Sequence, residues 1–190
     1  MGSRVHAALA VLIVTSCAGG TKGLRNRGDG PPPYASHDAE LFDDAIEPSA
    51  LGEAGEATLK PARSDMALRE RTQVSDATLR ARIVTVTVRD ENTGRSWLLG
   101  LQSLGVLTGQ RPPGSEFTVE VDPTNPAAGI LRAMEARLVG MTFVAFIREY
   151  AVQSTEGAVG EGTRWHFHLA RDDKSEIAAV REAAALGEVR

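Results

Sequence analysis

Residues 83–88 read IVTVTV, and this stretch decides the fold class of the chain. Its apolar and polar side chains alternate strictly, so Val84, Val86 and Val88 face one side of a predicted strand and the threonines face the other. A half-buried strand of this kind is typical of a protein built mainly from antiparallel β-sheet.

The chain on either side of the next turn predicts two more strands. Residues 90–95 contain Asp, Asn and Gly, which favour a turn, and residues 97–101 return as the partner strand. Residues 105–114 are rich in Gly and Pro and are expected to form a loop. A third strand is predicted at 116–121, where alternate side chains are again apolar.

A helix with recognisable ends follows the third strand. Asn125 is a good N-cap, Pro126 stands at the first helical position and Gly140 lies just past the end. Its predicted buried stripe consists of Ile130, Leu131, Met134 and Leu138.

Two further strands and one helix complete the prediction. Residues 141–152 predict a long fourth strand that is apolar on both faces near its centre, and residues 165–169 predict the fifth. Ser175 is expected to cap a final alanine-rich helix that ends near Leu186.

Three strands, a helix and two strands resemble in their order the OB-fold, a five-stranded barrel with a helix between strands three and four. We therefore expect residues 65–190 to form an α+β, mainly β, domain. The predicted architecture is a small five-stranded OB-like barrel with a C-terminal helix. No residue motif of a named OB family is present.

Length and charge limit the function classes. A chain of 190 residues has room for one domain of ordinary size. Its formal charge is −4, which argues against general nucleic-acid binding. Motifs for a nucleophilic serine, a zinc protease or a phosphate-binding loop are absent from the sequence. These features favour a protein that is not an enzyme.

The N-terminus predicts export. Residues 1–16 read MGSRVHAALAVLIVTS, in which Arg4 precedes an apolar run that is too short to span a bilayer. The run leads into Val14-Thr15-Ser16-Cys17, which resembles the lipobox of bacterial lipoproteins, with Val14 where that family most often has Leu. The resemblance implies that residues 1–16 are a signal peptide and that Cys17 becomes the lipidated first residue of the mature protein.

Cys17 is the only cysteine, so an internal disulfide, a catalytic cysteine and a cysteine-based zinc site are excluded. Two or three acyl chains give stable membrane anchoring. By analogy with the lipoprotein family, Ala18 at the position after the cysteine favours the periplasmic face of the outer membrane. The expected partners are the membrane, through this lipid, and a protein of the cell envelope.

Residues 17–64 are predicted to be a disordered, Gly- and Pro-rich acidic linker. Between Asp29 and Glu56 the chain has eight acidic residues and no Lys or Arg. One short helix is predicted inside it, with Ser36 as its cap and Pro48 as its stop. It has two possible roles, namely recognition of a partner or docking onto its own domain. Its apolar residues are Leu41, Phe42, Ala45 and Ile46.

Two pairs of residues are candidates for binding. His166 and His168 lie two apart on the fifth strand, so both imidazoles face the same side and could bind a divalent metal such as zinc. Trp97 and Trp165 could line a groove for a ligand. The leading hypothesis is binding or scaffolding without a cofactor, and the alternative is a metal-binding protein or metal-dependent hydrolase. The third metal ligand would come from Asp172, Asp173, Glu149 or His37.

Overall fold

The computed structural model describes residues 30–52, 64–91, 94–110, 112, 114–153 and 159–187. The chain divides into two units, Met1–Gly30 and Pro31–Arg190, and all described elements belong to the second. This unit is α+β and mainly β, as the alternating sequence predicts. Its elements are α1 (Ser36–Leu41), β1 (Ala45–Ile46), the 3-10 helix η1 (Pro48–Leu51), α2 (Met66–Val74), β2 (Ala77–Glu91), β3 (Gly94–Gly109), β4 (Glu116–Val121), α3 (Ala127–Leu138), β5 (Thr142–Gln153), β6 (Val159–Arg171) and α4 (Lys174–Gly187).

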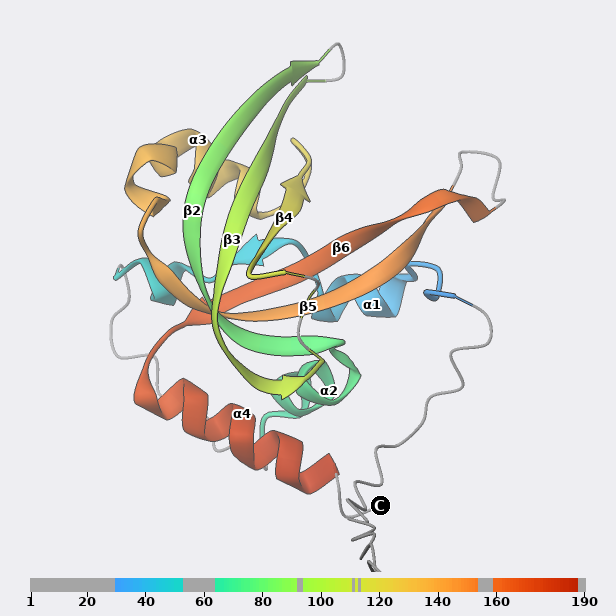
Figure 1. Ribbon diagram of the computed structural model, residues 1–190, viewed down its shortest axis with the longest axis vertical. Coiled ribbons are helices and arrows are strands. Elements are labelled where there is room, and N and C mark those ends of the chain that lie inside the picture. Colours follow the sequence, from blue (N-terminus) through green and yellow to red (C-terminus); the bar gives the residue numbers. More distant parts are fainter. Residues whose placement is uncertain are drawn as a thin grey trace, which may run out of the picture. The chain divides into compact units, whose positions relative to one another are not determined.

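The strands form one curled sheet in the order β1-β6-β5-β2-β3-β4 (Figure 1). β1 runs parallel to β6, and all other neighbours are antiparallel. β2 pairs with β3 along its length but with β5 only from Ala77 to Arg82. The β2–β3 and β5–β6 hairpins therefore cross near this point and diverge beyond it, which gives the sheet the form of a half-barrel (Figure 1).

The predicted order of three strands, a helix, two strands and a helix is confirmed by β2 to α4. The closed five-stranded barrel is not confirmed. The sheet has β1 as a sixth strand, and its edge strand β4 is not paired with β6. β3 also continues through the first half of the region predicted as a Gly- and Pro-rich loop and ends at Gly109.

A β-bulge changes which side chains of β2 face the core. The register of β2 against β3 shifts between Ile83 and Thr85, so Ile83 is fully buried and lies on the same side as Val86 and Val88. The prediction that Val84 belongs to this inner face is wrong for this reason. Gly100 lies opposite the bulge, where a Cβ atom would come within 2.2 Å of Thr85 Oγ1.

Two apolar clusters stabilise the domain. The first fills the inside of the curl, where Trp97, Leu99 and Leu101 of β3 meet the buried side of α3. The second lies on the outer face of β5 and β6 and includes side chains of α1, α2 and α4. Residues 143–147 of β5 contribute to both clusters and are fully buried, which confirms the prediction that this strand is apolar on both faces.

The described part of the predicted linker is folded. In the segment that we call the 31–51 segment, Phe42 is fully buried and Ile46 is 2% exposed. The prediction of a disordered linker over residues 17–64 is therefore wrong for residues 31–51, and the domain begins at Pro31 instead of residue 65. The predicted short helix is present only as α1, which ends at Leu41, and the prediction that Ala45 and Ile46 belong to it is wrong because they form β1. α1 docks onto its own domain, which was one of the two roles that the sequence left open.

Three predicted helix caps differ in detail. Ser36 is the first helical residue of α1, and Ala35 precedes it as the N-cap. Pro126 stands at the N-cap of α3, so Asn125 lies outside the helix. At α4 the side chain of Asp173 accepts the Glu176 N–H, a capping role predicted for Ser175.

Candidate functional site: a histidine–carboxylate cluster

The 31–51 segment lies along β6 and brings acidic side chains to the predicted histidines. β1 pairs with β6 at His168 and Leu169. The backbone N–H groups of Asp44 and Glu47 donate to the carbonyl oxygens of Phe167 and Leu169, at 2.9 and 2.8 Å. We call the group formed by Asp43, Asp44, Glu47, His166 and His168 the histidine–carboxylate cluster.

His168 lies between two carboxylates. Its Nδ1 is 2.8 Å from Asp43 Oδ1 and its Nε2 is 2.9 Å from Glu47 Oε1, while its side chain is only 8% exposed. Burial opposes the charged imidazole, but the hydrogen bonds to the two carboxylates raise the pKa of His168 above its usual value. Burial likewise opposes ionisation of Asp43 and Glu47, yet their bonds to His168 lower the pKa of each. These three pKa shifts favour a positively charged His168 between the ionised carboxylates of Asp43 and Glu47.

His166 is held by a different acidic residue. Its Nδ1 is 2.8 Å from Asp44 Oδ2. The ring of Tyr34 stacks on the imidazole at a centroid distance of 3.7 Å and an angle of 6°, and Tyr150 meets it edge-on at 5.6 Å. The ring is therefore fixed by one hydrogen bond and two aromatic contacts.

Asp44 connects the 31–51 segment to several parts of the domain. Its side chain is fully buried, and its carboxylate also accepts from Asn125 Nδ2 at 2.8 Å and from the Phe167 N–H at 3.1 Å. Its own carbonyl accepts the Ala127 N–H at the start of α3. Burial raises the pKa of Asp44, although His166 opposes this shift. Asp44 also has a φ of 52°, a left-handed backbone that Asp adopts more readily than most residues.

Further polar contacts hold α1 against the outer face of β5 and β6. Asp38 accepts from Tyr150 Oη at 2.7 Å and from Arg148 Nη1 at 3.3 Å. Arg71 Nε donates to the Leu41 carbonyl oxygen at 2.6 Å. Acidic groups of the 31–51 segment thus meet Arg and His side chains of β5 and β6, while its apolar side chains fill the outer cluster.

The predicted histidine pair lies on one face of β6, as its spacing indicates, and Phe167 and Leu169 point into the inner core. The two imidazoles do not share a carboxylate. Asp43 and Glu47 bond to opposite nitrogens of His168, so all three cannot converge on one ion. Among the described residues, no three His, Cys, Asp or Glu side chains are arranged to hold a metal.

The side chains expected to supply a third ligand lie elsewhere. Asp172 accepts two hydrogen bonds from Arg80, both at 2.7 Å, and Asp173 caps α4. Glu149 accepts from Thr163, and His37 is paired with Glu70. None of these four side chains is therefore placed to supply a third ligand beside His166 and His168. Metal binding by the two histidines stays a prediction.

The two tryptophans belong to the core. Trp97 is fully buried, its Nε1 donates to Glu135 Oε2 at 3.3 Å, and Arg132 lies 5.7 Å from its ring. The expectation that Trp97 lines a ligand groove is wrong, because no face of the ring reaches solvent. Trp165 is half-buried against the inner cluster.

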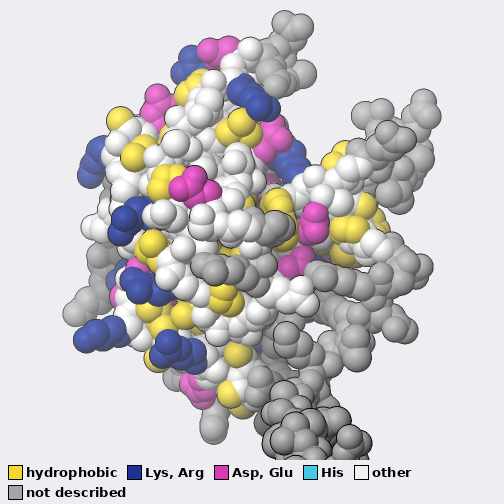
Figure 2. All heavy atoms as spheres, viewed as in Figure 1, with side chains coloured by type: hydrophobic (Ala, Val, Ile, Leu, Met, Phe, Trp, Pro, Cys, Tyr) yellow, Lys and Arg dark blue, Asp and Glu magenta, His cyan; other side chains and the backbone are white. Residues whose placement is uncertain are grey.

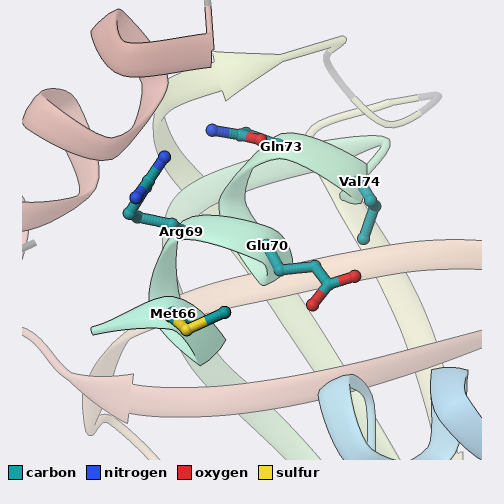
Figure 3. Close-up of a pocket in the computed structure, with 5 residues that line it drawn as sticks. All are labelled: Met66, Arg69, Glu70, Gln73 and Val74. Carbon is teal, nitrogen blue, oxygen red and sulfur yellow. The ribbon is translucent and has the colours of Figure 1, made fainter. Parts of the chain in front are cut away.

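One hollow in the described surface lies at α2, away from the cluster. It has a volume of about 400 Å³ and is lined by Met66, Arg69, Glu70, Gln73 and Val74 (Figure 3). These side chains follow the i, i+3, i+4, i+7 and i+8 positions of a single helix. The structure places neither histidine nor either tryptophan in this hollow.

Cys17 and the predicted signal peptide lie outside the described residues. None of the described helices has the length and apolar character required to span a membrane.

Sequence reasoning missed Asp43, Asp44 and Glu47 as partners of the histidines. Their acidity indicated a solvated linker, whereas each lies beside a basic group of β6 or α2. The sequence does contain a signal for this arrangement, because the apolar residues 41–42 and 45–46 alternate with the acidic residues. Such alternation favours a segment that is buried on one side.

Comparison of the chain with protein-family models, with curated proteins and with solved structures found no match to any of them.

Proposed function

We propose that this chain is an exported protein that is lipid-anchored at the cell envelope through Cys17 and binds a protein partner there without acting as an enzyme. The observation that carries this proposal is the order of Arg4, a short apolar run, small residues and Cys17. The domain begins at Pro31, soon after this sequence. Ala18 supports placement on the periplasmic face of the outer membrane.

The histidine–carboxylate cluster supports a binding or scaffolding role over catalysis. Both nitrogens of His168 and the Nδ1 of His166 already have carboxylate partners in the folded chain. These contacts hold the 31–51 segment against the sheet. His168, which has both nitrogens bonded, is unsuited to act as a general base.

A relationship with OB-type barrels is part of the proposal. The sheet order β6-β5-β2-β3-β4 and the position of α3 between β4 and β5 support it. Arg164 of β6 donates to the Glu120 carbonyl oxygen and pairs with Asp122 beyond β4, so the two edges that a closed barrel would join lie near each other. Fold likeness of this kind does not by itself define a ligand.

The decisive experiment is mass spectrometry of the chain extracted from the membranes of the cells that produce it. We expect a mature protein that starts at Cys17 and carries the added mass of acyl chains, and a Cys17→Ala variant that lacks this mass and leaves the membrane fraction. A chain that retains residues 1–16, or that has a free Cys17 thiol, contradicts the anchor. Cross-linking in the envelope should then recover a reproducible protein partner, and repeated absence of one contradicts the scaffolding role.

A further inference from the structure

Four exposed basic side chains lie on three neighbouring elements of the domain. They are Arg82 of β2, Arg137 in the last turn of α3, and Lys174 and Arg181 of α4. Figure 2 shows Lys and Arg side chains following one another along the left side of the view, over α3 and the start of α4.

Backbone contacts place the end of α3 beside β2, and a side-chain contact places the residue pair before α4 beside the same strand. Arg82 lies opposite Thr142 in the β2–β5 pair. The N–H of Ile83 donates to the Met141 carbonyl oxygen, and the Ile83 carbonyl accepts the Gly140 N–H. The end of α3 therefore lies beside Arg82. The side chain of Asp172, two residues before Lys174, is bonded to Arg80 of β2.

The four side chains form no ion pair in the described part of the chain, although Asp173 precedes Lys174 and Glu182 follows Arg181 in the sequence. Arg80, in contrast, is neutralised by Asp172. The mature chain from Cys17 has a formal charge of −5, because removal of residues 1–16 takes away Arg4 from a chain of charge −4. A basic surface on an acidic protein favours one orientation near an anionic surface.

Two exposed apolar side chains lie close to these residues along the chain or in the β2–β3 register. Val139 follows Arg137 and is 48% exposed. Leu104 is 39% exposed and lies at the register shift of β3 opposite Arg80 and Ala81. We call the four basic residues together with Leu104 and Val139 the basic strip.

We propose that the basic strip binds the anionic phospholipid headgroups of the bilayer that holds the Cys17 acyl chains. This inference rests on the proposed lipid anchor. Thirteen residues lead from Cys17 to Gly30, and a chain of that length spans at most about 45 Å, so the domain stays close to the bilayer. Basic side chains bind anionic headgroups, and Leu104 and Val139 can enter the apolar boundary beneath them.

The combination of charge and apolar exposure favours a lipid surface over nucleic acid. Protein–nucleic acid interfaces are polar and need many phosphate contacts, whereas this strip has four basic groups around two apolar ones. The strip therefore orients the domain on the membrane, with its acidic remainder turned toward the partner.

The test uses the mature full chain with Cys17→Ala, which carries no lipid, and vesicles of phosphatidylcholine with or without phosphatidylglycerol. We expect sedimentation with the anionic vesicles at low salt and its loss at high salt. A basic side chain near the surface contributes about a fivefold factor in partitioning, so Arg82→Gln/Arg137→Gln should bind on the order of 25-fold more weakly.

The matched control is Arg89→Gln/Arg95→Gln, which removes the same charge from exposed positions of the β2–β3 hairpin. Arg89 lies seven residues beyond Arg82, roughly 23 Å along the strand. We expect it to change binding less than twofold, and unchanged thermal unfolding should show that both variants fold.

Absence of binding to anionic vesicles, equal binding to neutral vesicles, or an equal loss in the control overturns the proposal. Binding of an acidic protein that depends on the strip, without vesicle binding, also overturns it and identifies a protein interface. Failure of the strip and failure of the anchor are separate results, because mass spectrometry of Cys17 reports only the anchor.

Discussion

Asp44 makes more polar contacts than any other residue of the histidine–carboxylate cluster. One fully buried carboxylate serves an imidazole, an amide side chain and a backbone N–H, and these belong to β6 and to the turn before α3. Removing one member of such a group leaves the others buried without partners, which costs more than the lost bonds themselves.

We therefore expect Asp44→Ala to lower the free energy of unfolding by about 3 kcal/mol. Asp44→Asn keeps the volume, one acceptor oxygen and tolerance of the positive φ, so its loss should be smaller, about 1–2 kcal/mol. Guanidinium denaturation of both variants measures the difference. A loss below about 0.5 kcal/mol for Asp44→Ala would contradict the role given to this carboxylate.

Glu176 makes the stability of the domain depend on pH. Its side chain lies in the first turn of α4 and is 6% exposed. Burial, reinforced by the charges of Glu47, Asp173 and Asp65, raises its pKa from 4.5 to about 7. The folded state thus binds a proton more tightly than the unfolded state does. Ionisation of Glu176 costs nothing below pH 4.5 and destabilises the fold progressively from there to about pH 7.

Glu176→Gln should remove this cost. At pH 8 we expect its free energy of unfolding to exceed that of the parent chain by on the order of 2 kcal/mol, after allowance for solvent screening, and at pH 4 the two should agree. Urea denaturation at both pH values provides the measurement, with exposed Glu116→Gln as control. An equal gain at both pH values would mean that ionisation is not the cause.

At the scale of single elements, the 31–51 segment packs against the domain although its helix α1 has only six residues. A helix this short is not stable alone, so burial of Phe42 and Leu41 against Phe146 and Tyr150 must supply its stability. The ion pair of Asp38 with Arg148 then sets its position.

Phe42→Ala tests this dependence. Loss of a buried phenyl ring should lower the free energy of unfolding by about 3–5 kcal/mol and make residues 31–51 the first site of limited proteolysis. Glu40→Ala on the exposed side of α1 should change neither quantity. The interpretation fails if the segment is cleaved equally fast in the parent chain and in the Phe42→Ala variant.

The same elements show what the sequence could and could not predict. Strict alternation located β4 at its observed bounds, and the run of apolar residues identified β5 as buried on both faces. Local patterns failed where the stabilising partner lies far along the chain. Asp43 and Asp44 meet β6 more than 120 residues later, so composition alone indicated a solvated linker. α2 was missed because only Leu68 and Thr72 are buried in it.

At the scale of the whole molecule, the half-barrel depends on the 31–51 segment to cover the outer face of β5 and β6. Without it, Tyr150 would lose its ring contacts with Tyr34 and Phe42, and His168 would lose the two carboxylates that balance its charge. A chain that begins at residue 64 lacks all of these contacts, whereas a chain that begins at residue 30 keeps them. The domain boundary predicted from sequence composition and the boundary in the structure therefore imply different folding behaviour.

We expect residues 30–190 to unfold in one cooperative transition, because both apolar clusters and the histidine–carboxylate cluster are complete. Residues 64–190 should lack this transition, bind a hydrophobic dye such as ANS and aggregate, because the part of the outer apolar cluster that Leu41 and Phe42 cover is exposed. Thermal unfolding followed by near-ultraviolet circular dichroism distinguishes the two chains. If the shorter chain unfolds at the same midpoint as the longer one, the 31–51 segment is an accessory to the fold, and the boundary at residue 65 was the better prediction.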